Sequence, residues 1–201
     1  DNIMPLGAFK AALMGTAGTA TTGDVVLLAT TAASSDSTIS FTSGINSTYG
    51  EYIFRFYNIH PSENSTSLQF QVNADGESDY NETITSTYFR AYHQESDGGT
   101  PTVAYESGTD QAQGTAFQFL TNVIPNNNDD SCAGELHIFN PASTTYVKHY
   151  YSKLHHPDTS PHAMIGFGAG YINTTGAITQ VQFKMNSGNI DAGTIKMWGV
   201  K

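Results

Sequence analysis

The stretch Leu68-Gln69-Phe70-Gln71-Val72-Asn73 alternates apolar and amide side chains without a break. Successive side chains of an extended chain point to opposite faces, so the three apolar residues share one face of a strand and the three amides share the other. Residues 51–59 repeat the pattern, with Tyr52, Phe54 and Phe56 on a common face. Alternation this regular predicts antiparallel strands that have one face in the core and one face in water.

The rest of the chain from Asp24 onward has the same strand-like period. Further short segments with β character are 25–29, 38–42, 83–93, 102–106, 116–123, 134–139, 146–152, 164–172, 178–185 and 194–200. Clusters of Gly, Pro, Asn, Asp and Ser separate them at intervals of about eight to twelve residues, which is typical of a β-sandwich or barrel. The continuous apolar run 25–29 predicts a short buried strand. No helix-spaced segment falls between the strands, which disfavours a parallel sheet with crossover helices.

Composition limits both the domain organisation and the class of partner. The chain has 201 residues, of which 38% are hydrophobic and 13% charged, enough for one domain with a sizeable core, which we place at residues 25–201. Eighteen acids against eight bases give a net charge of −10, so the chain lacks the basic field that nucleic-acid phosphates require. The apolar stretch 3–14 contains a proline and a lysine and is too short to cross a bilayer. We therefore expect neither nucleic acid nor a membrane as a partner.

Residues 1–24 are predicted to form an N-terminal arm outside the domain. The apolar residues of this arm are Ile3, Met4, Leu6, Phe9, Leu13 and Met14. A stretch rich in Gly, Thr and Ala follows at 15–23, with the composition of a flexible linker. An apolar segment on such a linker needs a surface to cover it, either this domain's own sheet or a neighbouring subunit. We expect these six residues to bind a partner surface.

The strongest enzyme-like motif is Glu77-Ser78-Asp79-Tyr80-Asn81-Glu82, which matches E-x-D-x-x-E. In β-sandwich glucanases this spacing places carboxylates on one face of a strand, where one acts as nucleophile and another as general acid. The intervening positions should then be apolar, whereas Ser78 and Asn81 occupy them directly after a turn at Gly76. We interpret the segment as a solvated acidic loop. Because nucleophile-elbow and phosphate-binding loop motifs are also missing from the sequence, we expect a non-enzymatic protein without catalytic residues or a cofactor.

The histidines and the single cysteine show no recognisable metal-binding spacing. His155, His156 and His162 lie around two prolines in a segment that we interpret as a loop, and no pair has the spacing of a sequence-encoded zinc site. A histidine from each chain could still hold an ion at a threefold axis, and the run 126–130 could offer oxygens to calcium. Cys132 follows two aspartates that would raise the pKa of its thiol, which predicts an inert side chain.

The aromatic residues are the remaining candidates for a binding surface. The chain has eleven tyrosines and eleven phenylalanines, and most of them must fill the core of a sandwich. Tyr146, Tyr150 and Tyr151 around His149 are expected exceptions, because both faces of their strand would carry large amphipathic rings. Such a strand faces a second sheet or another subunit, so we predict that these three tyrosines bind a partner.

The C-terminal strand pair resembles that of a group of virion proteins. Residues Ile178-Thr179-Gln180-Val181-Gln182-Phe183 lead through the turn Gly188-Asn189 to Gly193-Thr194-Ile195-Lys196-Met197-Trp198-Gly199-Val200. This ending is similar to that of structural proteins from tailed phages, notably marine and cyanobacterial ones, in which I-x-x-I-x-F leads through a G-N turn to G-T-I-x-L-Y-G-I. Residues 49–61 also resemble an early strand of these proteins. Met197 and Trp198 replace the usual Leu and Tyr, a change that a core tolerates.

The resemblance implies an all-β, jelly-roll-like antiparallel β-sandwich with a structural role in the virion. The group includes capsid cement proteins, head or tail appendages and fibre domains, commonly trimers. We therefore expect a capsid decoration (cement) protein on the surface of the phage particle, which binds the major capsid protein or other virion proteins as a homotrimer. The alternative is a tail or appendage adhesin domain that binds host-surface carbohydrate through exposed tyrosines and Asn/Asp loops.

Overall fold

The computed structural model describes residues 24–201 with the exception of residues 78 and 97. Its strands are β1 (Val25–Ala32), β2 (Ile39–Phe41), β3 (Glu51–Pro61), β4 (Leu68–Ala74), β5 (Ile84–Gln94), β6 (Thr102–Tyr105), β7 (Gln118–Phe119), β8 (Cys132–Phe139), β9 (Lys148–Pro157), β10 (His162–Ile172), β11 (Ile178–Met185) and β12 (Ile190–Val200). Within this part of the chain no helix is long and apolar enough to cross a membrane. The predicted arm, including Ile3, Met4, Leu6, Phe9, Leu13 and Met14, lies outside the described residues.

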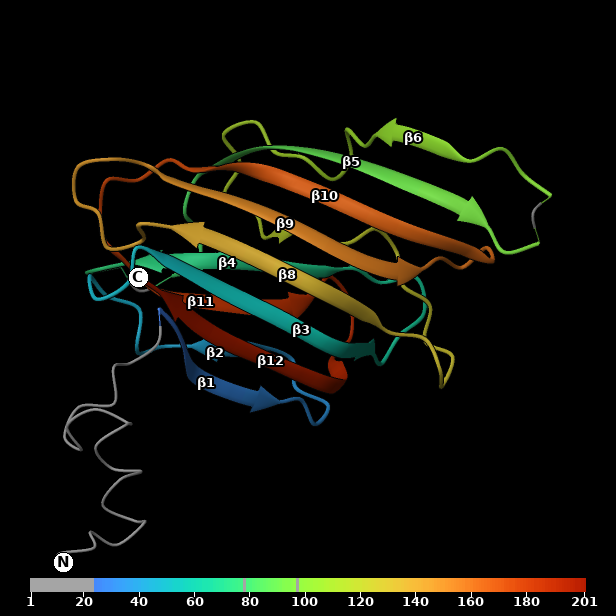
Figure 1. Ribbon diagram of the computed structural model, residues 1–201, viewed down its shortest axis with the longest axis horizontal. Coiled ribbons are helices and arrows are strands. Elements are labelled where there is room, and N and C mark those ends of the chain that lie inside the picture. Colours follow the sequence, from blue (N-terminus) through green and yellow to red (C-terminus); the bar gives the residue numbers. More distant parts are fainter. Residues whose placement is uncertain (1–23, 78, 97) are drawn as a thin grey trace, which may run out of the picture.

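The strands form two antiparallel sheets that pack face to face (Figure 1). The larger sheet has the order β1-β12-β3-β8-β9-β10-β5-β6, and the smaller sheet has the order β2-β11-β4-β7. The pairs β1–β12, β2–β11, β3–β8 and β4–β7 are nested in the sequence, which is the pairing of a long hairpin rolled into a jelly roll. The hairpin β9–β10 and the pair β5–β6 extend the larger sheet beyond β8. The prediction of an antiparallel, jelly-roll-like sandwich is confirmed.

Aromatic side chains fill the centre of the sandwich. Phe54 on β3 lies edge-to-face against Phe41 on β2 and Phe183 on β11, with ring centroids 5.3 Å apart in both pairs. Phe56 packs on Phe183 in the same way at 5.2 Å. All four rings are buried, and each such pair contributes about 0.5–1.5 kcal/mol beyond the burial of its area. These contacts fix β3 of the larger sheet over β2 and β11 of the smaller sheet.

The strand that we expected to be half exposed, β4, is buried on both faces. Gln69, Gln71 and Asn73 are as inaccessible as the apolar residues between them. The Gln71 amide donates to the backbone carbonyls of Glu82, at 2.9 Å, and Ala116, at 3.1 Å. The prediction of a water-facing side is wrong, because neighbouring loops supply the hydrogen bonds that water would otherwise make.

The segment around His155 and His156 is a strand, not the predicted loop. Strand β9 continues to Pro157 and pairs with β10 along its length. Alternation places His155 in solvent and His156 in the interior, where its ring is fully buried. Burial lowers the pKa of His156 to about 4, because a charged imidazolium is disfavoured away from water.

Candidate interaction surface

The exposed large apolar side chains gather on one face of the larger sheet. We call this the outer face, the side that points away from the smaller sheet. Seven side chains on it are between 41% and 73% exposed: Val25, Leu27, Tyr57, Phe89, Val103, Tyr105 and Tyr151. Tyr146, which precedes β9, is the one further large apolar side chain that is exposed among the described residues. This concentration on a single face makes the outer face the candidate interaction surface.

Strand register joins these side chains into continuous rows. One row runs from Leu27 through Trp198, Ile53 and His137 to Tyr151, across five strands. The rings of His137 and Tyr151 stack with centroids 4.4 Å apart. Towards the other edge, Phe89 and Phe167 stack at 5.0 Å, and Phe89 pairs with Tyr105 on β6. Cross-strand ring pairs stabilise the sheet and leave a flat aromatic surface.

The first strand of this surface differs from its prediction. The run 25–29 lies in β1, at the edge of the larger sheet, where it pairs only with β12. Val25 is 51% exposed and Leu27 is 45% exposed. The expectation of a short buried strand is therefore wrong, because Val25 and Leu27 point to the outer face, where no layer formed by the described residues covers them.

Charged residues among the rows are already paired with one another. Glu135 lies 3.7 Å from the Arg55 guanidinium and 3.8 Å from the Lys153 ammonium. The Arg55 guanidinium also lies over the Trp198 ring, at 5.7 Å from its centroid, and Lys196 lies over Tyr57 at 5.1 Å. Charges compensated in this way are covered by a partner at a lower desolvation cost than isolated ones.

A cluster of His137 and two carboxylates lies at the centre of the outer face. His137 Nδ1 contacts the Glu51 carboxylate, and its Nε2 lies 3.5 Å from Glu135 Oε1. Burial and the charges of Glu51 and Glu135 raise the pKa of the stacked Tyr151 phenol. Tyr151 therefore stays neutral and serves as an aromatic contact with a polar tip.

The three tyrosines predicted to bind a partner lie in different environments. Tyr151 belongs to the outer face, and Tyr146 is 74% exposed. Tyr150 lies inside the sandwich, 3% exposed, with its ring 5.1 Å from that of Phe70 on β4. The prediction that Tyr150 binds a partner is wrong, because its side of β9 faces the smaller sheet.

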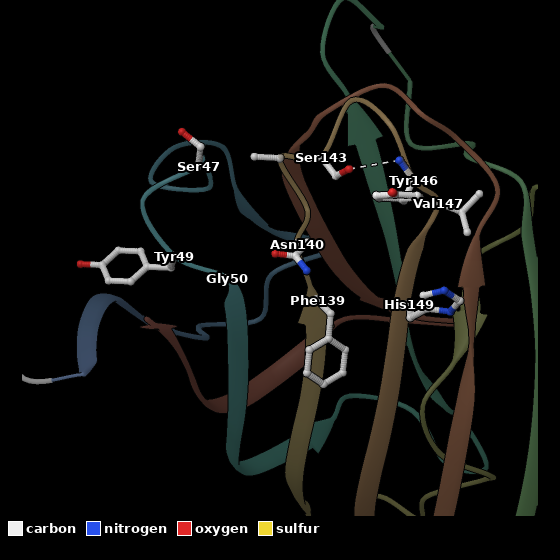
Figure 2. A pocket seen from close by; sticks show the side chains of 10 residues that line it. Ser47, Tyr49, Gly50, Phe139, Asn140, Ser143, Tyr146, Val147 and His149 are labelled. Atoms are coloured by element: carbon white, nitrogen blue, oxygen red, sulfur yellow. Dashed lines mark hydrogen bonds between the residues drawn. The ribbon is translucent and has the colours of Figure 1, made fainter.

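A cavity of about 620 Å³ lies at the end of the sandwich where β3 begins and β8 ends. The loop before β3 and the loop between β8 and β9 enclose it (Figure 2). In the view of Figure 2, Ser47 and Tyr49 lie on one side, Tyr146, Val147 and His149 lie on the other, and Asn140 and Phe139 lie between them. The lining joins aromatic rings to amide and hydroxyl groups, a combination suited to a small amphipathic ligand.

The acidic motif and the cysteine have the environments that the sequence suggested. Glu77 and Asp79 are exposed and lie outside any strand, in a loop that starts at the Gly76 turn. Glu82 accepts a hydrogen bond from the Ala74 backbone NH at 3.1 Å. Cys132 is buried, and burial raises the pKa of its thiol to about 12, so burial has the effect that we attributed to the adjacent aspartates.

Neither the His137 cluster nor the other histidines and acids of the described residues form a metal-binding group. Within residues 24–77, 79–96 and 98–201, no group of three His, Cys, Asp or Glu side chains is placed to hold a metal ion. In the Asn-rich turn at 126–130, the Asn127 amide donates to Asp130 Oδ2 at 2.6 Å. The structure tests neither of the two ion sites that the sequence left open, calcium at this turn and an ion at a threefold axis.

Sequence reasoning missed most of the outer face. Leu27, Tyr57, Phe89, Val103 and Tyr105 all lie within segments that we expected to be strands, yet we singled out none of them. A usable signal was present, because Phe89 is a large ring on the opposite parity from the buried residues of β5, and Tyr105 alternates in the same way with the half-buried residues of β6. No protein-family model matches the chain, and no curated protein or solved structure is significantly similar to it.

Proposed function

We propose that the protein is a non-enzymatic structural protein of a phage virion, a capsid decoration (cement) protein on the particle surface. The outer face carries this proposal, because a flat apolar and aromatic surface on a chain with net charge −10 is suited to contact with another protein. The virion assignment rests on the resemblance of residues 178–200 to phage structural proteins.

The chemistry of the outer face favours stapling of other proteins. Its rows combine Trp198, Tyr151 and Phe89 with the guanidinium of Arg55, and Trp, Tyr and Arg are the residues that dominate binding energy at interfaces. We propose that the major capsid protein or other virion proteins bind this face, that the protein acts as a homotrimer, and that residues 1–24 add a second contact. A stapling role requires interfaces larger than about 1,000 Å².

The first experiment places charge on the outer face. The double variant Phe89→Asp and Tyr151→Asp should abolish binding to phage heads that lack the protein, measured by co-sedimentation. It should also remove the gain in thermal stability that the wild-type chain gives to those heads. Ser40→Asp, on an exposed position of β2 in the smaller sheet, is the matched control and should bind as the wild type does.

The second experiment removes the arm. Deletion of residues 1–20 should weaken binding to heads while the folded domain keeps its melting temperature. Undiminished binding after this deletion would remove the arm from the mechanism, and undiminished binding by the double Asp variant would overturn the proposal for the outer face.

A tail or appendage adhesin that binds carbohydrate is the second candidate function. The cavity beside Tyr146 favours it, because that site combines exposed aromatic and amide groups. Imaging of the particle with a labelled antibody against the chain separates the two functions, since a cement protein covers the head and an adhesin marks the tail.

A further inference from the structure

The cavity at the end of the sandwich carries an exposed ring on a hydrogen-bonded turn. Tyr146 is 74% exposed, although its backbone is part of an ordered turn. The Ser143 hydroxyl accepts hydrogen bonds from the backbone NH groups of Thr145, at 3.3 Å, and Tyr146, at 3.1 Å. A ligand that stacks on this ring therefore orders one side chain and no loop, which lowers the entropic cost of binding.

An unused amide lies beside this ring. Asn140 has a positive φ of 44°. Its backbone NH donates to the Gly50 carbonyl at 2.7 Å, and its carbonyl accepts a hydrogen bond from the Ser143 NH at 3.0 Å. Its side-chain amide makes no hydrogen bond to any residue that the structure describes, and it lies between the two walls of the cavity (Figure 2). The amide offers two donors and an acceptor to a ligand at a position fixed by the turn.

The remaining walls define the charge and size of the ligand. Phe139 and His149 form further ring surfaces of the cavity, and Ser47 adds a hydroxyl. None of the lining residues is Asp, Glu, Lys or Arg, so no permanently charged side chain offers a counter-charge to an ionic ligand, and His149 is the one lining side chain that can become a cation. The volume of about 620 Å³ lies within the range of small-molecule sites.

From these observations we propose that the cavity binds a neutral pyranose sugar. A pyranose ring has an apolar face of C–H groups that stacks on an aromatic ring, and neighbouring hydroxyls that pair with an amide. Tyr146 supplies the stacking surface, and Asn140 supplies the paired donor and acceptor. The inference rests on the second candidate function and names its ligand class, while the site is separate from the contacts proposed for the outer face and does not depend on the cement role.

The test uses the full chain and a panel of uncharged sugars. Glucose, galactose, mannose, N-acetylglucosamine and their β-linked disaccharides are titrated by saturation-transfer NMR and isothermal calorimetry, with sialic acid as the charged comparison. We expect at least one to bind, and Tyr146→Ala to weaken that sugar about tenfold, because loss of one aromatic contact corresponds to about 1.4 kcal/mol. Asn140→Gly keeps the positive φ and removes only the amide, so it should weaken binding without altering the turn.

Tyr105→Ala is the matched control, because it removes another exposed ring from the far edge of the sheet. This variant should bind the sugar as the wild type does. Absence of binding by every sugar in the panel would overturn the proposal. So would affinities unchanged in both cavity variants, or tighter binding of sialic acid than of any neutral sugar.

Discussion

The two halves of the larger sheet are buried by different side-chain chemistry. Beneath β12, β3 and β8, the apolar half, inward-facing residues are aromatic or aliphatic, with Phe54, Leu136 and Met197 as examples. Beneath β9, β10 and β5, the mixed half, the inward positions include Ser86, Ser152 and His156, which are just as inaccessible. One sheet therefore joins a half filled by apolar volume to a half that also buries polar groups, of which the Ser86 hydroxyl is hydrogen-bonded whereas the Ser152 hydroxyl and His156 Nε2 have no hydrogen-bond partner among the described residues.

The mixed half is covered partly by residues 107–124, which run beneath β5 and contain β7 of the smaller sheet. The side chain of Gln118 on β7 ties this segment to β5. Gln118 Oε1 accepts a hydrogen bond from the Ser86 hydroxyl at 2.7 Å, and Nε2 donates to the Thr109 carbonyl at 2.8 Å. Such a cover replaces apolar contact with directed bonds, and each broken bond leaves a buried polar group unpaired.

The largest effect is expected in the apolar half. Phe183→Ala removes the ring that contacts Phe41, Phe54 and Phe56 and should lower the free energy of unfolding by about 3–5 kcal/mol, because a cavity adds to the lost burial. Urea denaturation followed by fluorescence measures the change. A loss below about 1 kcal/mol would show that the other three rings close the cavity without it.

The second effect is a pH dependence that arises in the mixed half. The pKa of His156 is about 4 in the fold because of burial and about 6.5 in the unfolded chain. Above pH 6.5 both states are neutral there. Between pH 6.5 and 4 the unfolded state binds the proton and the folded state does not, so stability falls as pH falls, by about 3 kcal/mol in total.

His156→Leu provides the comparison for that measurement. Urea denaturation of both proteins is measured from pH 7.5 to pH 4 in steps of about half a unit. For each chain this gives the slope of the free energy of unfolding against pH. The difference between the two slopes isolates His156 from the remaining histidines. Parallel slopes would mean that His156 is protonated equally well in the folded state.

A smaller effect on the free energy of unfolding is expected from the Gln118 amide, which holds residues 107–124 beneath β5. In Gln118→Leu the new side chain is similar in size to glutamine. It cannot accept the hydrogen bond from the Ser86 hydroxyl or donate one to the Thr109 carbonyl. We expect a loss of about 1–3 kcal/mol in urea denaturation. Gln182→Leu is the control, because its amide bonds only to the Ser40 hydroxyl in an exposed position. Equal losses in both variants would contradict a special role for the buried amide.

Periodicity predicted the strands and the sandwich because each strand carries its own alternation. It could not predict what covers each face. The alternation of β4 is the same whether its amides bind water or the carbonyls of Glu82 and Ala116. Only the position of a loop distant in sequence decides between them, and that position is a property of the whole chain.

The parity of β9 shows the same limit at the candidate surface. Its inward face begins with Lys148, a residue that a sequence pattern assigns to solvent, and alternation then carries Tyr150 into the core. The Lys148 ammonium donates to the carbonyls of Thr174, at 3.0 Å, and Gly176, at 2.5 Å, and burial lowers its pKa. Because Lys148 is buried by its hydrogen bonds to this turn, Tyr150, two residues later on the same face of β9, lies in the core and not at a partner surface.

The smallest effect on stability is expected at the outer face. Val103 is 73% exposed on β6, which forms one edge of the larger sheet. Val103→Asp should change the free energy of unfolding by no more than about 0.5 kcal/mol, because neither half of the interior loses a contact. Co-sedimentation with phage heads should nevertheless fall, because the new carboxylate adds negative charge to the contact surface and a partner must desolvate it. Substitutions in the two buried halves are expected to lower stability and binding together, whereas Val103→Asp is expected to lower binding alone. A Val103→Asp chain that unfolds more easily would show that Val103 contributes to the interior packing, and one that binds heads as before would place this edge outside the contact surface.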